Sequence, residues 1–244
     1  METKGPVFIF DTPEQLAKAP AERFVEYSRI ATAEHGLFAV ALSGGNTPRR
    51  VYELLATDSF RNRINWPMVH LFFGDERSVP PDHPDSNYRM VYEALISRVA
   101  IPAKNVHPIM GEGDPDENAR AYERELKSFF AGLSWPRFDL TLLGLGEDGH
   151  TASLFPGTDA VEQKSKWVVA VYVAGLETFR ITLTIPVFNH TAHIVFLVTG
   201  KQKAKRLAQV VQGTPDIDER PAQKIQPVNG SLEWLVDKAA ASLL

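Results

Sequence analysis

The stretch LFAVALSGGNTP, residues 37–48, decides the fold of this chain. Its first half, residues 37–42, is continuously apolar, which is typical of a strand whose sheet is covered on both faces. Its second half contains two glycines and ends at Pro48, a residue suited to the first turn of a helix. A buried strand that passes through a tight loop into a helix is the repeating unit of a parallel α/β sheet.

The same alternation of apolar runs and amphipathic stretches continues along the chain. We expect further strands at residues 69–73, 138–143, 167–173, 180–185 and 193–198. We expect helices at residues 21–34, 48–56, 86–99, 115–130, 201–212 and 232–242, with Ser86 and Asp114 as caps. This order predicts an α/β fold with a mostly parallel sheet and helices on both faces.

The composition excludes several classes of protein. The chain has 244 residues, of which 44% are hydrophobic and 23% charged, so we expect residues 1–244 to form a single α/β domain. It has no cysteine, which excludes disulfides and thiolate chemistry. The net charge of −4 and the lack of a long basic run predict no nucleic-acid partner. Residues 1–10 resemble neither a signal peptide nor a membrane span, so we expect a cytoplasmic protein without membrane contact.

In sheets of this class, ligands bind in the loops that follow the carboxyl ends of the strands. After the strand at 37–42, Ser43 and Thr47 supply hydroxyl groups, and Gly44 and Gly45 allow the backbone to approach a ligand closely. Free amide groups at the start of the next helix favour an anion. The loop therefore fits a phosphate site, although an ordinary strand-to-helix turn would use the same residues.

The sequence Gly-Asp-Glu-Arg, residues 74–77, follows the next expected strand. Arg77 carries a planar donor fork that suits an oxyanion or a carboxylate. Asp75 is a candidate either for proton transfer or for holding Arg77, and a purely structural ion pair is the alternative. Asn87 is expected one residue inside the following helix, where it is placed to tie down this loop.

The loop GLGEDGHTASLFPG, residues 144–157, is the most informative part of the chain. Its glycines surround an acid and an imidazole, and an imidazole suits proton transfer near neutral pH. His150 is therefore the predicted catalytic base, and Asp148 is the candidate to orient its ring. Two cations, Arg180 at the start of a strand and Lys203 at the junction of a strand and a helix, are candidates to neutralise a phosphate, with solvated surface charge as the alternative.

The other histidines suggest no metal site. His190 and His193 have a spacing that brings two ligands together only on a helix, and His193 is expected to begin a strand. We expect no clustered partners for the remaining four, which are His35, His70, His83 and His107. The sequence therefore predicts neither a metal nor a cofactor.

Three stretches, at 43–48, 74–77 and 144–157, together resemble the 6-phosphogluconolactonase family. Ser-Asn at 86–87 and Arg-Ile-Thr-Leu-Thr at 180–184 add to the resemblance. It implies a modified Rossmann-like, doubly wound fold that is shared with glucosamine-6-phosphate deaminase. It also implies hydrolysis of 6-phospho-D-glucono-1,5-lactone to 6-phospho-D-gluconate in the oxidative pentose phosphate pathway.

The resemblance also implies roles for individual residues. His150 resembles the base that activates water, and Arg77 resembles a cation that stabilises substrate or oxyanion. The phosphate contacts that it implies are Ser43, Gly44, Gly45, Arg180 and Lys203. The chain departs from the family at residues 177–179, Glu-Thr-Phe, where prolines are common, and at Asn46, where Ser is more usual.

Two alternatives stay open at this point. A deaminase of the same fold would continue from Asp-Gly-His toward Asn-Glu, whereas this chain has Phe155 at the acidic position, and it would tend to have Tyr in place of Arg77. A non-catalytic sugar-phosphate sensor would usually carry a DNA-binding extension, for which the chain leaves no room. We expect a monomer, with a weak dimer as the alternative.

Overall fold

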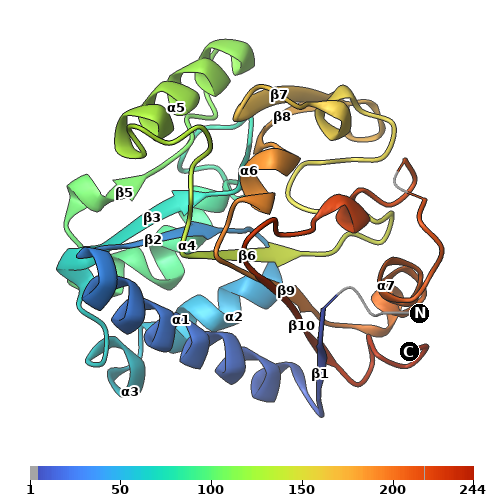
Figure 1. Ribbon diagram of the computed structural model, residues 1–244, viewed down its shortest axis with the longest axis horizontal. Helices are drawn as coiled ribbons and strands as arrows, with labels where there is room; N and C mark the ends of the chain where they lie inside the picture. Colours follow the sequence, from blue (N-terminus) through green and yellow to red (C-terminus); the bar gives the residue numbers. More distant parts are fainter. Residues whose placement is uncertain (1–4, 217) are drawn as a thin grey trace.

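The centre of the molecule is a seven-stranded sheet in which every neighbouring pair of strands is parallel (Figure 1). The computed structural model describes residues 5–216 and 218–244. In sheet order the strands are β1 (Val7–Phe10), β10 (Ser231–Asp237), β9 (His193–Val198), β6 (Leu140–Gly144), β2 (Phe38–Leu42), β3 (Val69–Phe73) and β5 (Val106–His107). The expected parallel α/β architecture is confirmed.

Helices cover both faces of this sheet. On one face, Phe24 of α1 (Pro13–His35) contacts Phe38 of β2, with ring centroids 5.0 Å apart. On the other, Phe129 of α5 (Pro115–Phe129) contacts Phe72 of β3, also at 5.0 Å. In the register of these parallel strands Phe38 pairs with Val69 and Phe72 with Ala41, so the two aromatic rings point to opposite sides.

The other α-helices are short. They are α2 (Asn46–Leu55), α3 (Asp58–Arg61), α4 (Asn87–Ala94), α6 (Ile185–Asn189) and α7 (Ala204–Val211). The Ser86 hydroxyl accepts from the Arg89 amide at 3.1 Å, and Asp114 accepts from the Glu117 amide at 2.8 Å, which confirms both predicted caps. Among the described residues, none of the helices combines the length and the apolar character needed to cross a bilayer.

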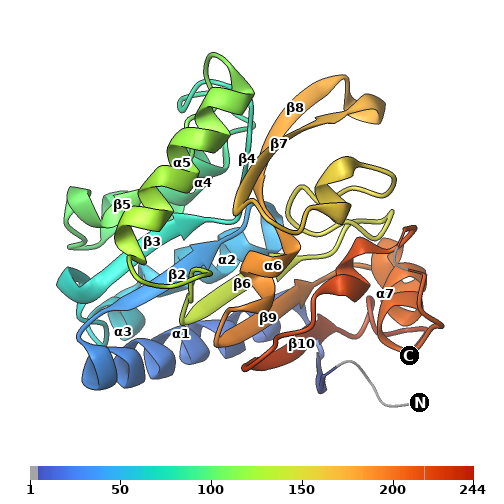
Figure 2. The same ribbon diagram turned by 45° about the horizontal axis from the view of Figure 1, so that its top comes forward.

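A second, antiparallel sheet stands beside α5 (Figure 2). Its strands are β4 (Asp75–Arg77), β8 (Thr178–Leu183) and β7 (Val168–Val173). The strands expected at 167–173 and 180–185 therefore exist, but they pair with each other and with β4 instead of joining the parallel sheet. Gly74 connects the two sheets, because its amide donates to Leu42 O at 2.8 Å and its carbonyl accepts from the Leu183 amide at 2.9 Å.

The prediction of a helix at residues 232–242 was wrong. Residues 231–237 form β10, which lies inside the sheet between β9 and β1. Its Trp234 is buried against Phe196 of β9, with ring centroids 4.0 Å apart. Pairing on both sides satisfies the backbone of this segment, and that tertiary contact overrides its local helical pattern. Strand β1, which pairs with the outer edge of β10, was not predicted either.

The order of the strands creates a crevice above β2 and β6. From β2 the chain moves outward through β3 to β5, whereas β6 is followed by β9 and β10 on the other side. The loops that leave the carboxyl ends of β2 and β6 consequently diverge. In open α/β sheets this switch point is the usual location of a binding site.

His70 and His107 are not isolated, contrary to expectation. Neighbouring strands β3 and β5 place His70 Nδ1 3.1 Å from His107 Nε2, and His107 Nδ1 lies 2.6 Å from Glu125 Oε1 on α5. Burial, with a further contribution from the charge of His107, lowers the pKa of His70 to about 4.

This shift predicts a pH dependence of stability. Between the ordinary pKa of histidine, about 6.5, and about 4, the unfolded chain takes up a proton at His70 that the folded chain does not. The stabilising contribution is thus fully present above about pH 6.5 and is lost as the pH falls toward 4. We expect urea unfolding to show a smaller loss of stability over this range for His70→Gln than for wild type. His83→Gln, at an exposed loop position, serves as the control, and equal pH profiles for wild type and His70→Gln would contradict the prediction.

Candidate functional site

A cleft of 400 Å³ lies at the carboxyl ends of β2, β3, β6 and β9. All the predicted site residues line it except Asp148, which lies behind His150, and Arg180, which lies beside Arg77. The lining comprises Ser43, Gly44, Gly45, Asn46, Thr47, Pro48, Asp75, Arg77, Asn87, Gly144, Leu145, Gly146, His150, Ala152, Leu197, Val198, Thr199, Gln202 and Lys203. Loops far apart in the sequence are therefore brought to one cavity.

Among the described residues, the loop after β2 contributes to the cleft one hydroxyl without a partner and a helix start without a side-chain cap. The Ser43 hydroxyl is buried and has no hydrogen-bond partner within the described residues. The backbone of Ser43 is fixed from behind by the buried Tyr52 hydroxyl, which donates to its carbonyl at 2.9 Å. No side chain caps α2, whose N-cap is Gly45 with a φ of 102°. An anion is the ligand that such a helix start and a free hydroxyl favour.

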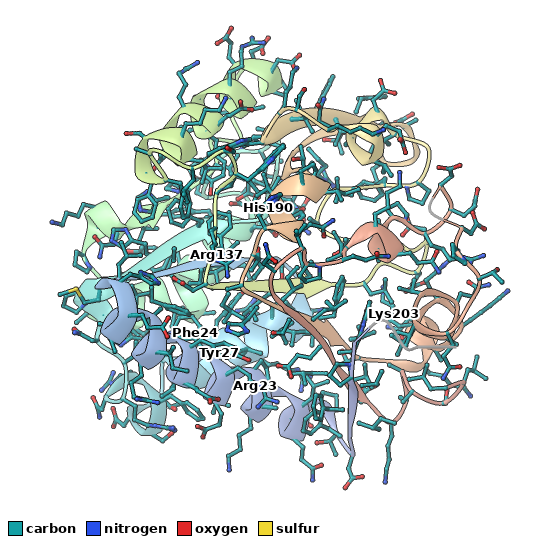
Figure 3. All side chains as sticks on the ribbon, in the orientation of Figure 1. Arg23, Phe24, Tyr27, Arg137, His190 and Lys203 are labelled. Carbon is teal, nitrogen blue, oxygen red and sulfur yellow. The ribbon has the colours of Figure 1, made fainter. Side chains whose placement is uncertain are left out.

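Lys203 lines the cleft from the loop after β9, and its Nζ lies 3.8 Å from Glu147 Oε1. It is the last residue of a short 3-10 helix (Lys201–Lys203) that leads into α7 (Figure 3). Thr199 and Thr47 share a hydrogen bond of 2.7 Å between their hydroxyl oxygens, which joins the two loops. Asp237 at the end of β10 accepts from the Gly200 amide at 3.1 Å and so fixes the turn that carries Lys203.

His150 of the loop after β6 lines the cleft and forms a close pair with Asp148. His150 Nδ1 lies 2.5 Å from Asp148 Oδ1, which also accepts from the His150 amide at 3.1 Å. Burial raises the pKa of Asp148, but the hydrogen bonds and charge of His150 outweigh it, so the pKa stays below its usual value. With Nδ1 engaged, the free Nε2 is the atom able to take a proton. Phe155 packs on the imidazole, with ring centroids 4.2 Å apart.

Gly146 leaves the space that this pair occupies. A Cβ at position 146 would lie 2.1 Å from His150 Nδ1 and 2.5 Å from Asp148 Oδ1. Gly149 turns the chain with a φ of 94°, and its carbonyl accepts from the Ala222 amide at 3.1 Å. The glycines of this loop therefore serve the placement of the base.

The two carboxylates of the loop after β3 have different partners. Glu76 is buried and accepts from three backbone amides, those of Arg77, Asn87 and Tyr88, each at 2.8 Å. Burial raises the pKa of Glu76, and these amides oppose it. Glu76 therefore anchors the start of α4. Asp75 is also buried, and its Oδ2 accepts from the Ser153 hydroxyl at 2.6 Å.

Arg77 and Arg180 lie opposite each other on β4 and β8. Within the described part of the chain, neither guanidinium has a carboxylate at ion-pair distance. Arg77 donates to Asp85 O at 2.7 Å and to Asn87 Oδ1 at 2.5 Å, and Asn87 also donates to Asp75 O, which confirms that Asn87 ties down this loop. Burial and the charge of Arg77 lower the pKa of Arg180. Two adjacent cations without carboxylate partners favour an anionic ligand.

Sequence reasoning gave no role to Ser153 or Gln202. Ser153 lies inside the quoted 144–157 run but faces Asp75, a contact across 78 positions that no local pattern signals. Gln202 lines the cleft one residue before Lys203.

His190 and His193 have different neighbours, since the first stacks on Trp135 and the second on Tyr27.

A larger groove of 1070 Å³ lies between α5, β7 and the loop after His150. It contains Asp148 and Phe155 but neither the loop after β2 nor Lys203. Half of its charged residues come from α5, which contributes both acids and bases. The smaller cleft is the candidate site, because it is the one of the two that brings the His150 imidazole together with Arg77 and Lys203.

Gly146→Ala is expected to displace the His150 ring, because the new methyl group would overlap it. Gly144→Ala is the matched control, since a Cβ there meets no atom within 4 Å. We expect the imidazole resonances of His150 in an NMR spectrum to shift in the first variant and to stay unchanged in the second. Unchanged resonances in Gly146→Ala would show that the pair does not rest on this glycine.

Known proteins resemble this chain over most of its length. The family model described as glucosamine-6-phosphate isomerases/6-phosphogluconolactonase matches residues 11–234. A 6-phosphogluconolactonase of Synechocystis is 45% identical over 218 residues, which are 88% of each chain. The structure of a 6-phosphogluconolactonase from Trypanosoma cruzi matches with a TM-score of 0.87 and 29% identity, over 100% of this chain and 98% of that one.

A monomeric glucosamine-6-phosphate deaminase of known structure has the same fold. It superposes with a TM-score of 0.82 over 98% of this chain and 100% of its own, at 21% identity. At that identity the likeness concerns the fold alone, which confirms the expected modified Rossmann-like, doubly wound architecture.

Proposed function

Because the chain belongs to the family of glucosamine-6-phosphate isomerases and 6-phosphogluconolactonases, we propose that its cleft hydrolyses 6-phospho-D-glucono-1,5-lactone to 6-phospho-D-gluconate. This is a step of the oxidative pentose phosphate pathway. One observation carries the proposal: a carboxylate-paired imidazole lines the same 400 Å³ cavity as Arg77, Lys203 and the Ser43 hydroxyl, which has no hydrogen-bond partner among the described residues. Lactone hydrolysis needs a base for water and a stabiliser for an oxyanion, and the cleft contains both.

His150 acts as the general base. Asp148 holds Nδ1 of the ring, so Nε2 removes a proton from the water molecule that attacks the lactone carbonyl. The imidazolium that forms is stabilised by the Asp148 carboxylate. It then returns the proton to the ring oxygen as the carbon–oxygen bond breaks, and the products are a carboxylic acid and a hydroxyl group. The reaction balances without a covalent enzyme intermediate.

Arg77 stabilises the negative charge that develops on the carbonyl oxygen. Its guanidinium lines the cleft and has neutral partners, Asp85 O and Asn87 Oδ1, so its charge stays available. Asp75 supports this arrangement through Asn87. Because the Asp75 carboxylate is already engaged by Ser153 and Asn87, we assign it to holding the loops and not to proton transfer.

The phosphate group of the substrate binds at the loop after β2. Ser43, Thr47 and the first amides of α2 supply hydrogen bonds, Gly44 and Gly45 allow close approach, and Lys203 supplies charge. Arg180, which pairs with Arg77 in the register of β4 and β8, supplies a further positive charge for the anion. Anchoring this end orients the reactive carbonyl toward His150.

The environment of His150 separates this activity from the deaminase alternative. Phe155 occupies the position where the deaminase pattern has an acid, and its ring packs on the imidazole at 4.2 Å. An apolar ring there cannot transfer a proton. Release of ammonia from glucosamine 6-phosphate by the purified protein would instead support the deaminase.

We also propose that the protein acts as one domain, as a monomer, in the cytoplasm. A single cluster of buried apolar side chains includes residues of α1, the parallel sheet and β8. A phosphorylated sugar does not cross a bilayer unaided, so its lactone is hydrolysed in the compartment where it forms. A molar mass of 27.2 kDa by light scattering is the expected result for the monomer.

His150→Ala is expected to lower kcat by about 10²–10⁴-fold, the usual value of general-base catalysis. Affinity for the product, 6-phosphogluconate, should stay near that of wild type, because the phosphate end of the cleft is untouched. Acid release from freshly prepared lactone, corrected for spontaneous hydrolysis, measures kcat, and calorimetry measures the affinity. His35→Ala is the control, and an unchanged kcat in His150→Ala would remove the mechanism.

Lys203→Ala is expected to raise KM by about 10- to 100-fold, the value of a hydrogen bond to a charged group, with a small effect on kcat. Lys201→Ala changes an exposed lysine of the same 3-10 helix and is the matched control. Hydrolysis of unphosphorylated gluconolactone should be insensitive to both variants. An equal loss on that substrate would argue against phosphate anchoring by Lys203.

A further inference from the structure

Asn87 occupies a junction between three parts of the cleft. Asn87 is 1% exposed and is the first residue of α4. Its Nδ2 donates to Asp75 O at 2.9 Å and lies 3.3 Å from Asp75 Oδ1, while its Oδ1 accepts from Arg77 at 2.5 Å. The orientation of the amide is fixed chemically, because a guanidinium can only donate and a carbonyl can only accept.

The loop after β2 is shaped around the same amide. A Cβ on Gly44 would lie 1.7 Å from Asn87 Oδ1, so only glycine permits this approach. Asp75 extends the junction to a third loop, since its Oδ2 accepts from Ser153 at 2.6 Å. Asn87 thus contacts both the Ser43–Gly45 turn and Arg77, and reaches the His150 loop through one intermediate residue.

The neutrality of Asn87 is the feature with chemical consequences. A carboxylate at this position would also accept a hydrogen bond from Arg77, but it would neutralise the charge of the guanidinium. It would also repel the Asp75 carboxylate. An amide supplies the same acceptor geometry without the charge, and its NH₂ group satisfies Asp75 O. The charge of Arg77 is consequently left for a ligand in the cleft.

We propose that Asn87 is a positioning residue that aims the Arg77 guanidinium into the cleft while leaving its charge uncompensated. The inference rests on the proposed lactone hydrolysis, in which Arg77 stabilises the oxyanion. It assigns a function to a side chain that itself takes no part in proton transfer and that fills the space left by Gly44.

The test is Asn87→Asp, which keeps size and shape. At neutral pH we expect kcat to fall by about 10- to 100-fold, with a smaller change in KM, because the new carboxylate quenches Arg77 and repels Asp75. When it is protonated, the new carboxyl group donates to Asp75 O and accepts from Arg77, as the amide does. The ratio of kcat/KM between variant and wild type should therefore rise several-fold from about pH 8 to about pH 5.

Asn105→Asp is the matched control. Asn105 is 2% exposed, and its Nδ2 donates to Pro67 O and Val69 O, outside the cleft lining. This variant should lower the free energy of unfolding but leave kcat and its pH profile unchanged once corrected for the folded fraction. Asn87→Ser, which removes both long contacts, should lose kcat at every pH without recovery.

The outcomes separate this inference from the proposed function. A wild-type protein without lactonase activity would overturn the function, and the role of Asn87 would then be read from calorimetric affinity for 6-phosphogluconate. In that assay Asn87→Asp must weaken binding at neutral pH, and Asn105→Asp must not. A flat activity ratio for Asn87→Asp, or wild-type kcat in Asn87→Ser, overturns the positioning role in an active enzyme.

Discussion

The geometry of the cleft depends on the hydrogen bonds that the buried Asp75 carboxylate accepts. The Ser153 hydroxyl donates to one of its oxygens from the loop after β6, and the Asn87 amide approaches the other from the start of α4. The parallel sheet brings the strand ends together, but it does not set how the loops beyond them face each other. A buried carboxylate must have donors, so the loops that supply them are held in one arrangement.

The distribution of charge in the cleft differs from that of the whole chain. The protein carries a net charge of −4, yet the carboxylates of Asp75, Glu76 and Asp148 each accept hydrogen bonds from protein donors. The cations Arg77 and Arg180 have no such carboxylate partner among the described residues. Arg77 in the cleft and Arg180 beside it are therefore cations that an anionic ligand can pair with, in a chain that is acidic overall.

More of the candidate site than of the fold could be predicted from the sequence. The loops at 43–48, 74–77 and 144–157 are contiguous, and the rule that ligands bind beyond parallel strand ends was enough to bring them together. The segment at 232–242 was misassigned because its strand character comes from pairing with β9 and β1, which no local pattern shows. The His70–His107 contact and the Asn87–Gly44 approach likewise depend on residues far apart in the chain.

The pair Asp148–His150 forms part of the wall between two cavities. His150 lines the 400 Å³ cleft, while Asp148 lines the 1070 Å³ groove on the other side. A small molecule that captured the Asp148 carboxylate from the groove would deprive the imidazole of its orienting partner without entering the cleft. Inhibition of that kind would be non-competitive with substrate, and the inhibitor would not have to imitate a charged sugar.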